Sequence, residues 1–162
     1  MTGLDIKELL SNAQEYANKF SGCKKVSVGS ILIPKKSNKG TVFIYGSNRS
    51  LPASCRSIGC RRVALYGEDS KNHRLPSDCR AIHSEVDAIT QAAKWGYSTS
   101  RATLVVTRYP CEACARAIVG AGIKTVYYGR EQEISEETQK IFDAARVKVV
   151  HVNDWLYEDT RR

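Results

Sequence analysis

Two short stretches carry residues whose types and spacing could do chemistry: His83-Ser84-Glu85 and Tyr109-Pro110-Cys111-Glu112-Ala113-Cys114. The imidazole of His83 and the thiolates of Cys111 and Cys114 are three ligands that suit zinc, and three protein ligands leave a fourth position for water. Zinc lowers the pKa of such a water towards neutrality. Glu85 lies two residues from His83, close enough to reach that water and move protons without binding the metal. The two stretches together predict a catalytic zinc site.

Each stretch alone has other interpretations. A C-x-x-C pair occurs as a redox couple or as half of a structural zinc site, and a lone H-x-E is close to noise. A zinc module without catalysis, whose role is interaction, is a third alternative. A proline before the first cysteine, with a helical pattern after each half, favours the catalytic site. This order of residues is the signature of zinc nucleobase deaminases.

At these residues the chain resembles the cytidine/deoxycytidylate deaminase superfamily, and most of all its zinc-dependent dCMP deaminases. The likeness runs from about Ser21 to Val152. It is carried by residues 82–89, IHSEVDAI, similar to that family's HAE-x-NAI, and by residues 105–124, similar to YPCxxCAxxIxxAGIK. Ser84 replaces the usual Ala, and Asp87 replaces the usual Asn and adds charge just past the site.

The resemblance implies hydrolytic deamination of dCMP to dUMP and ammonia, with attack at C4 of the cytosine ring and Glu85 as the proton shuttle. The backbone N–H of Cys111, at a helix start, is expected to hold the reacting oxygen. By the same resemblance, Asn48 would bond the sugar or base, and the carbonyl region of Tyr109 would meet the exocyclic amine. Arg49 follows Asn48 where the family has Gly.

Basic residues crowd the segment before His83, and the net charge of the chain is +8. A forked guanidinium suits a phosphate, so one or two of these arginines could bind the 5′-phosphate of dCMP, although most would form a solvated basic surface. They are Arg49, Arg56, Arg61, Arg62 and Arg80. A deaminase acting on DNA, RNA, a free nucleoside or a modified base remains an alternative. A nucleic-acid groove is disfavoured because only Tyr66 in this segment could stack on bases.

Four further cysteines could form a second, structural zinc site, as in some phage-type dCMP deaminases, with His73 as a further candidate ligand. They are Cys23, Cys55, Cys60 and Cys79. The alternative is that they are small buried hydrophobic residues. Six cysteines without a disulfide framework fit a reducing compartment, and the cytoplasm is the expected location.

Length and composition predict one soluble domain spanning residues 1–162. Apolar residues make up 42% of the chain and charged residues 26%, which is ordinary for a globular protein. No apolar run approaches the length of a membrane span, and the first residues do not resemble a signal peptide. By resemblance, we expect a homo-oligomer, commonly a hexamer in that family, with dCTP and dTTP as effectors.

Hydrophobic periodicity predicts the elements that must position these residues. Helices are expected at 5–20, 83–95, 110–121 and 135–145, and strands at 26–33, 41–45, 103–107, 124–128 and 147–152. Pro110 is expected at the first helical position, with Cys111 and Cys114 in the opening turns. Residues 47–82 read as a long irregular specificity loop or lid. The order predicts an α/β fold with a five-stranded mixed sheet, and the resemblance implies a cytidine-deaminase-like three-layer α-β-α arrangement with helices on both faces.

Overall fold

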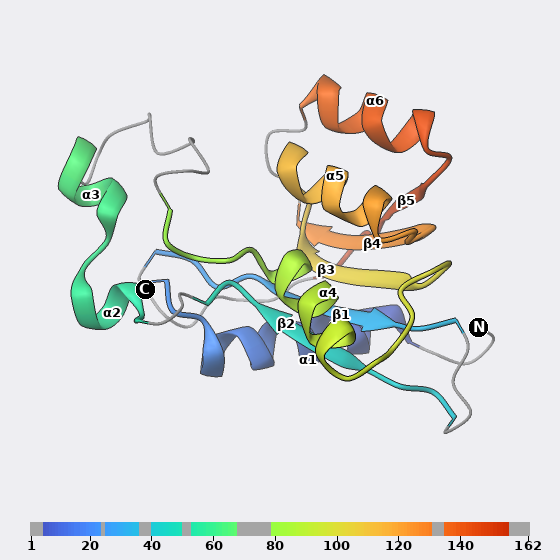
Figure 1. Ribbon diagram of the computed structural model, residues 1–162, viewed down its shortest axis with the longest axis horizontal. Coiled ribbons are helices and arrows are strands. Elements are labelled where there is room, and N and C mark those ends of the chain that lie inside the picture. The colour runs from blue at the N-terminus through green and yellow to red at the C-terminus, as the bar shows by residue number, and fades with distance from the viewer. Residues whose placement is uncertain are drawn as a thin grey trace.

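The computed structural model describes residues 5–23, 25–35, 40–49, 53–67, 79–130 and 135–155. Five strands form one mixed sheet in the order β2-β1-β3-β4-β5 (Figure 1). They are β1 (Gly29–Ile33), β2 (Ile44–Ser47), β3 (Thr103–Arg108), β4 (Thr125–Arg130) and β5 (Lys148–His151). β1 runs antiparallel to β2 and β3, whereas β3, β4 and β5 are parallel. The predicted five-stranded mixed sheet is confirmed.

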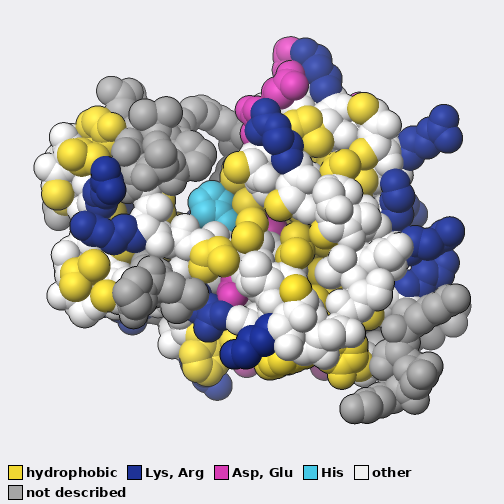
Figure 2. All heavy atoms as spheres, viewed as in Figure 1, with side chains coloured by type: hydrophobic (Ala, Val, Ile, Leu, Met, Phe, Trp, Pro, Cys, Tyr) yellow, Lys and Arg dark blue, Asp and Glu magenta, His cyan; other side chains and the backbone are white. Residues whose placement is uncertain are grey.

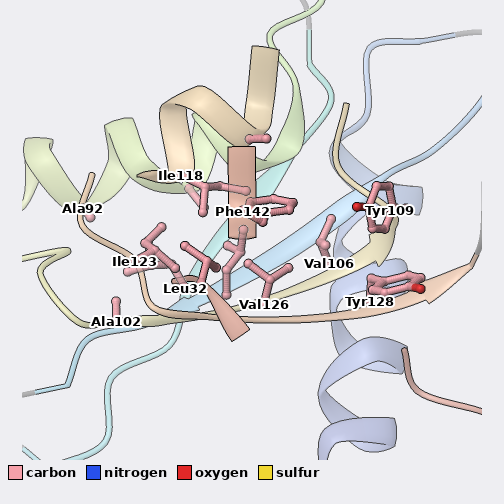
Figure 3. Packing of buried hydrophobic residues seen from close by; sticks show 14 of the residues in the cluster. Leu32, Ala92, Ala102, Val106, Tyr109, Ile118, Ile123, Val126, Tyr128 and Phe142 are labelled. Atoms are coloured by element: carbon pink, nitrogen blue, oxygen red, sulfur yellow. The ribbon is translucent and has the colours of Figure 1, made fainter. Parts of the chain in front are cut away.

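Helices cover both faces of this sheet because alternate strand residues point to opposite sides. On one face, Leu10 of α1 (Ile6–Phe20) packs with Ile31 and Val105. The other face carries α4 (Ser84–Lys94), α5 (Glu112–Gly120) and α6 (Glu136–Ala144). There Ile118 of α5 and Phe142 of α6 lie over Val126 of β4 (Figure 3). The predicted three-layer α-β-α fold is confirmed. No helix in the described residues is long and apolar enough to cross a membrane.

The described parts of the predicted loop, residues 47–49, 53–67 and 79–82, are less irregular than the sequence predicts. They include the end of β2 and two short helices, α2 (Cys55–Ile58) and α3 (Arg61–Tyr66), which lie to one side of the sheet in Figure 1. The side chain of Ser54 accepts from the Ser57 N–H and caps α2. α3 has no buried residue. Sequence periodicity missed both helices because such short elements with exposed side chains show no apolar stripe.

Several predicted boundaries shift by a few residues. β1 begins at Gly29 rather than 26, because the backbone N–H of Val28 donates to the side chain of Asn48 instead of extending the strand. Cys111 is the N-cap of α5, so Pro110 precedes the cap and is not the first helical residue. Asp5 and Ser135 are N-caps whose side chains accept from backbone N–H groups, so both helices begin one residue later than predicted. These are ordinary end effects of one or two residues at most helices.

α4 packs closely on β2 at Gly46. A Cβ at this position would lie 2.2 Å from the carbonyl oxygen of Ser84 and 2.6 Å from the backbone nitrogen of Ala88. Gly46→Ala is therefore expected to push α4 away from the sheet and lower the free energy of unfolding by about 3 kcal/mol. Urea unfolding measures this. The matched control is Gly120→Ala in α5, where an added Cβ meets nothing within 4 Å. Equal stability of the two variants would contradict this packing.

Candidate functional site

Two helix starts bring the three predicted ligands together. His83 is the N-cap of α4, while Cys111 is the N-cap of α5 and Cys114 lies in the first turn of α5. The Nδ1 atom of His83 lies 3.4 Å from the Sγ of Cys111 and 3.3 Å from the Sγ of Cys114. Nitrogen and sulfur ligands of a tetrahedral zinc lie about 3.5 Å apart. In the part of the chain that the structure describes, no other group of three His, Cys, Asp or Glu residues converges within 4.8 Å. The donor set therefore fits a zinc ion.

Hydrogen bonds within this group favour the thiolate form of Cys111. The Cys114 thiol donates to Cys111, and together with the contact to His83 this lowers the pKa of Cys111 to about 4 against the opposing effect of burial. The same thiol contact and burial raise the pKa of Cys114. The hydrogen bond to Cys111 raises the pKa of His83. Thiolate is the form of cysteine that binds metals.

Glu85 lies beside the three ligands, with only 4% of its surface exposed. Burial raises the pKa of its carboxyl group above the ordinary value. The hydroxyl of Ser84 donates to Oε2 of Glu85 at 3.0 Å, which restricts rotation of the carboxyl group. The carbonyl of Ser84 accepts from the hydroxyl of Ser30 in β1 at 2.7 Å, which fixes the first turn of α4 to the sheet. A buried carboxyl group held in this way can both take and give a proton.

A cavity of about 210 Å³ opens at this group. One part of its wall is apolar, from Val26 and Val28, and Glu85 lines it close to the ligands. Arg62 of α3 and Arg108 at the end of β3 also line it. In Figure 2, a hollow with a histidine side chain at its edge separates the α2–α3 segment from the main body. The lining of the pocket thus includes one acidic residue, Glu85, and two arginines, Arg62 and Arg108.

The structure brings some of the predicted substrate contacts to this cavity and not others. Asn48, Tyr109 and Cys111 line it. The Oδ1 of Asn48 accepts from the backbone N–H of Val28, and its Nδ2 donates to the carbonyl of Val26, both at 2.9 Å. Arg49 is not among the lining residues that the structure describes, and its guanidinium group contacts Asp87 instead.

Sequence reasoning missed two residues at the site. Ser84 counts as a mild replacement for Ala in sequence, yet its hydroxyl contacts the carboxylate of Glu85. Arg108 lies in the stretch 105–124 that carries the resemblance, but the sequence suggested no function for it. In the structure it lines the cavity. The signal for Arg108 was its place at the carboxyl end of a parallel strand, where the ligand sites of open α/β sheets form.

The four cysteines that are candidate ligands of a second zinc differ in their surroundings. Cys23 and Cys79 line the cavity, Cys55 is buried, and Cys60 is the N-cap of α3. Burial chiefly raises the pKa of Cys79, with a smaller contribution from Cys23 and Cys55, which lie within electrostatic reach. They do not join any three-residue ligand group among the described residues. His73, the further candidate ligand, lies outside the described residues.

The class of protein that this fold and site define is the cytidine/deoxycytidylate deaminase superfamily, whose members are hydrolytic enzymes. Residues 4–158 match the MafB19-like deaminase family. The chain belongs to that family.

Relatives with curated names fall into two groups. ComE operon protein 2 of Bacillus subtilis is 33% identical over 134 residues, which cover 82% of this chain and 63% of that protein. The deoxycytidylate deaminase of Mycobacterium phage D29 is 29% identical over 131 residues, 81% of this chain and 99% of that protein. That of Enterobacteria phage T2 is 41% identical over 75 residues, 46% of this chain and 40% of the phage protein. The chain thus spans less than two thirds of two of these relatives.

A solved structure supports the fold independently. The dCMP deaminase of cyanophage S-TIM5, in its apo form, superposes with a TM-score of 0.66 and 22% sequence identity, covering 94% of this chain and 100% of the phage chain. The same phage enzyme in complex with dCMP and dUMP gives a TM-score of 0.64 and covers 90% of this chain and 95% of that one.

Proposed function

We propose that this chain hydrolyses dCMP to dUMP and ammonia, consuming one water. The observation that carries the proposal is the buried carboxylate of Glu85 beside the His83–Cys111–Cys114 group, in a cavity that two arginines line. Relatives named deoxycytidylate deaminases support the choice of substrate.

The chain's own residues account for the proton transfers. His83, Cys111 and Cys114 would hold a zinc ion, which supplies a water of lowered pKa. Glu85 takes a proton from the attacking water and delivers it to N3 of the cytosine ring. It then takes the second proton and delivers it to the amino group that leaves C4 as ammonia. The backbone N–H of Cys111, at the N-cap of α5, donates to the oxygen that adds to C4.

The substrate contacts follow from the lining of the cavity. Asn48 would bond the sugar or base, and the backbone at Tyr109 would meet the exocyclic amine. Arg62 and Arg108 supply the cationic groups that a 5′-phosphate requires, because a guanidinium fork binds phosphate oxygens with two parallel hydrogen bonds. Of the five arginines that the sequence offers as phosphate ligands, only Arg62 is among the described residues that line the cavity, and Arg108 would bind the phosphate with it.

The decisive experiment compares substrates for the zinc-loaded protein. Ammonia release is measured with dCMP, CMP, deoxycytidine, dCTP and a cytosine-containing oligonucleotide. Turnover of dCMP well above that of deoxycytidine supports the proposal. Turnover of the oligonucleotide in place of dCMP would make this a polynucleotide deaminase, and turnover of deoxycytidine alone would remove the role of the phosphate.

Removing one guanidinium group tests the phosphate contact directly. Arg108→Gln is expected to lower kcat/KM for dCMP about 30-fold and that for deoxycytidine less than about threefold, since only the nucleotide carries the phosphate. Steady-state kinetics on both substrates measures the ratio. Arg56→Gln is the matched control, because Arg56 is exposed on α2 and does not line the cavity. An equal loss on both substrates in Arg108→Gln would contradict phosphate binding.

Several further properties are proposed. The family resemblance suggests a homo-oligomer, effector binding by dCTP and dTTP, and a second structural zinc. Length and composition suggest one domain over residues 1–162, and cysteine usage suggests a cytoplasmic location. Sedimentation with and without each nucleotide tests assembly and effector binding. Metal analysis tests the second zinc, which requires two equivalents for each chain.

A further inference from the structure

A partly buried ion pair joins the segment just after β2 to the first turns of α4. Arg49 donates to Oδ1 of Asp87 from Nη2 at 2.6 Å and from Nε at 3.0 Å. Only 1% of the Asp87 side chain is exposed, against 31% of the Arg49 side chain. The other oxygen of Asp87 accepts from the backbone N–H of Ser47 at 3.0 Å. One carboxylate therefore holds the residues on both sides of Asn48.

The pair also reaches the metal-ligand group through the backbone. The carbonyl of Arg49 accepts from the N–H of Ile82 at 2.9 Å, and Ile82 immediately precedes His83. The N–H of Asp87 donates to the carbonyl of His83, also at 2.9 Å. The contacts therefore close a ring that runs from Asp87 to Arg49, Ile82, His83 and back to Asp87. Because Asn48 lies next to Arg49, this ring ties a residue of the cavity wall to His83.

Both partners of this ion pair are charged residues at positions where the resembled family pattern has an uncharged one. Arg49 stands where the resembled pattern has Gly, and Asp87 stands where it has Asn. Either charge alone would be costly, since a buried carboxylate without a cation loses its hydration without compensation. Their direct contact explains why both occur together.

We propose that Arg49 and Asp87 are positioning residues that fix Asn48 relative to the His83–Cys111–Cys114 group and so determine how tightly the nucleotide binds, an inference that rests on the proposed function. Neither residue is among the described residues that line the cavity. The pair fixes the distance between Asn48, which would bind the sugar or base, and the His83–Cys111–Cys114 group, where the reaction would take place.

A double-mutant cycle tests this coupling, with Arg49→Gln, Asp87→Asn and the double variant assayed on dCMP. Each single variant is expected to raise KM about tenfold while kcat stays within about threefold, because binding geometry changes and the proton shuttle does not. The double variant is expected to recover KM to within about threefold of the wild type, since two neutral amides can bond each other. Arg116→Gln is the control, because it breaks the exposed Arg116–Glu112 pair of α5.

Hydrogen exchange gives a second readout that needs no substrate. In Arg49→Gln, the amides of Ser47 and Ile82 are expected to exchange at least about tenfold faster, and the double variant should restore their protection. If wild-type protein does not deaminate dCMP, the proposed function fails, and the exchange result still decides whether the pair positions this segment. If the double variant keeps the raised KM of Arg49→Gln, then Arg49 contacts the phosphate itself, and the inference is overturned. Unchanged exchange in both single variants would overturn it as well.

Discussion

Glu85→Gln is expected to lower kcat for dCMP by about 10³-fold or more, while zinc content stays at the wild-type level. Glutamine has nearly the same shape as glutamate, but its amide cannot take a proton from the attacking water. The cavity should keep its form, since the substituted side chain can still accept from the hydroxyl of Ser84. Steady-state kinetics with metal analysis of the same samples measures both effects.

The fold should tolerate this substitution because it removes a charge that is 4% exposed, and burial of a charge is costly. Glu136→Gln is the matched control, since Glu136 lies exposed in the first turn of α6. It should retain full activity. Turnover at the wild-type rate by Glu85→Gln would show that Glu85 is not the proton shuttle.

Cys114→Ser is expected to reduce bound zinc to below about 0.1 equivalents for each chain and to abolish deamination. The serine hydroxyl remains protonated at neutral pH and is a poor zinc ligand, so only two ligands would remain. Zinc that binds only the folded chain stabilises it by about 4 kcal/mol when its free concentration is 1,000 times Kd. A loss of this size lowers Tm by about 10 °C in a domain of this length.

Thermal unfolding with and without a chelator separates the metal effect from the side-chain effect. Wild-type protein should lose thermal stability on chelation, whereas Cys114→Ser should not respond. Cys60→Ser provides the control, because Cys60 caps α3 outside the three-ligand group. It should keep its catalytic zinc, and a fall from two equivalents to one in this variant would support the second metal site. Full zinc occupancy in Cys114→Ser would rule out Cys114 as a ligand.

The sequence by itself determined the chemistry-bearing residues and the order of the elements. A motif of fixed spacing places ligands on helix starts, and the periodicity of apolar residues locates four helices and five strands, because both signals are local. His83, Cys111 and Cys114 needed no tertiary information for this reason. The fold brings these three side chains within hydrogen-bond distance of one another, as a metal-ligand group requires.

Only the tertiary structure decided which charged residues enter the cavity. Arg49 and Arg62 look equivalent in sequence, since both lie in a basic segment before His83. In the fold, Asp87 captures the guanidinium group of Arg49, whereas α3 brings Arg62 to the cavity wall. Asp87 lies 38 residues from Arg49 in the chain, so no local pattern reports their contact.

The same reason explains the other differences. α2 and α3 escaped prediction because their side chains are mostly exposed and show no period. The hydroxyl of Ser84 donates to the carboxyl group of Glu85 because the first turn of α4 places the two side chains together. Local spacing thus determined what chemistry this chain can do, while long-range packing decided which side chains surround it, because those contacts join residues that are distant in sequence.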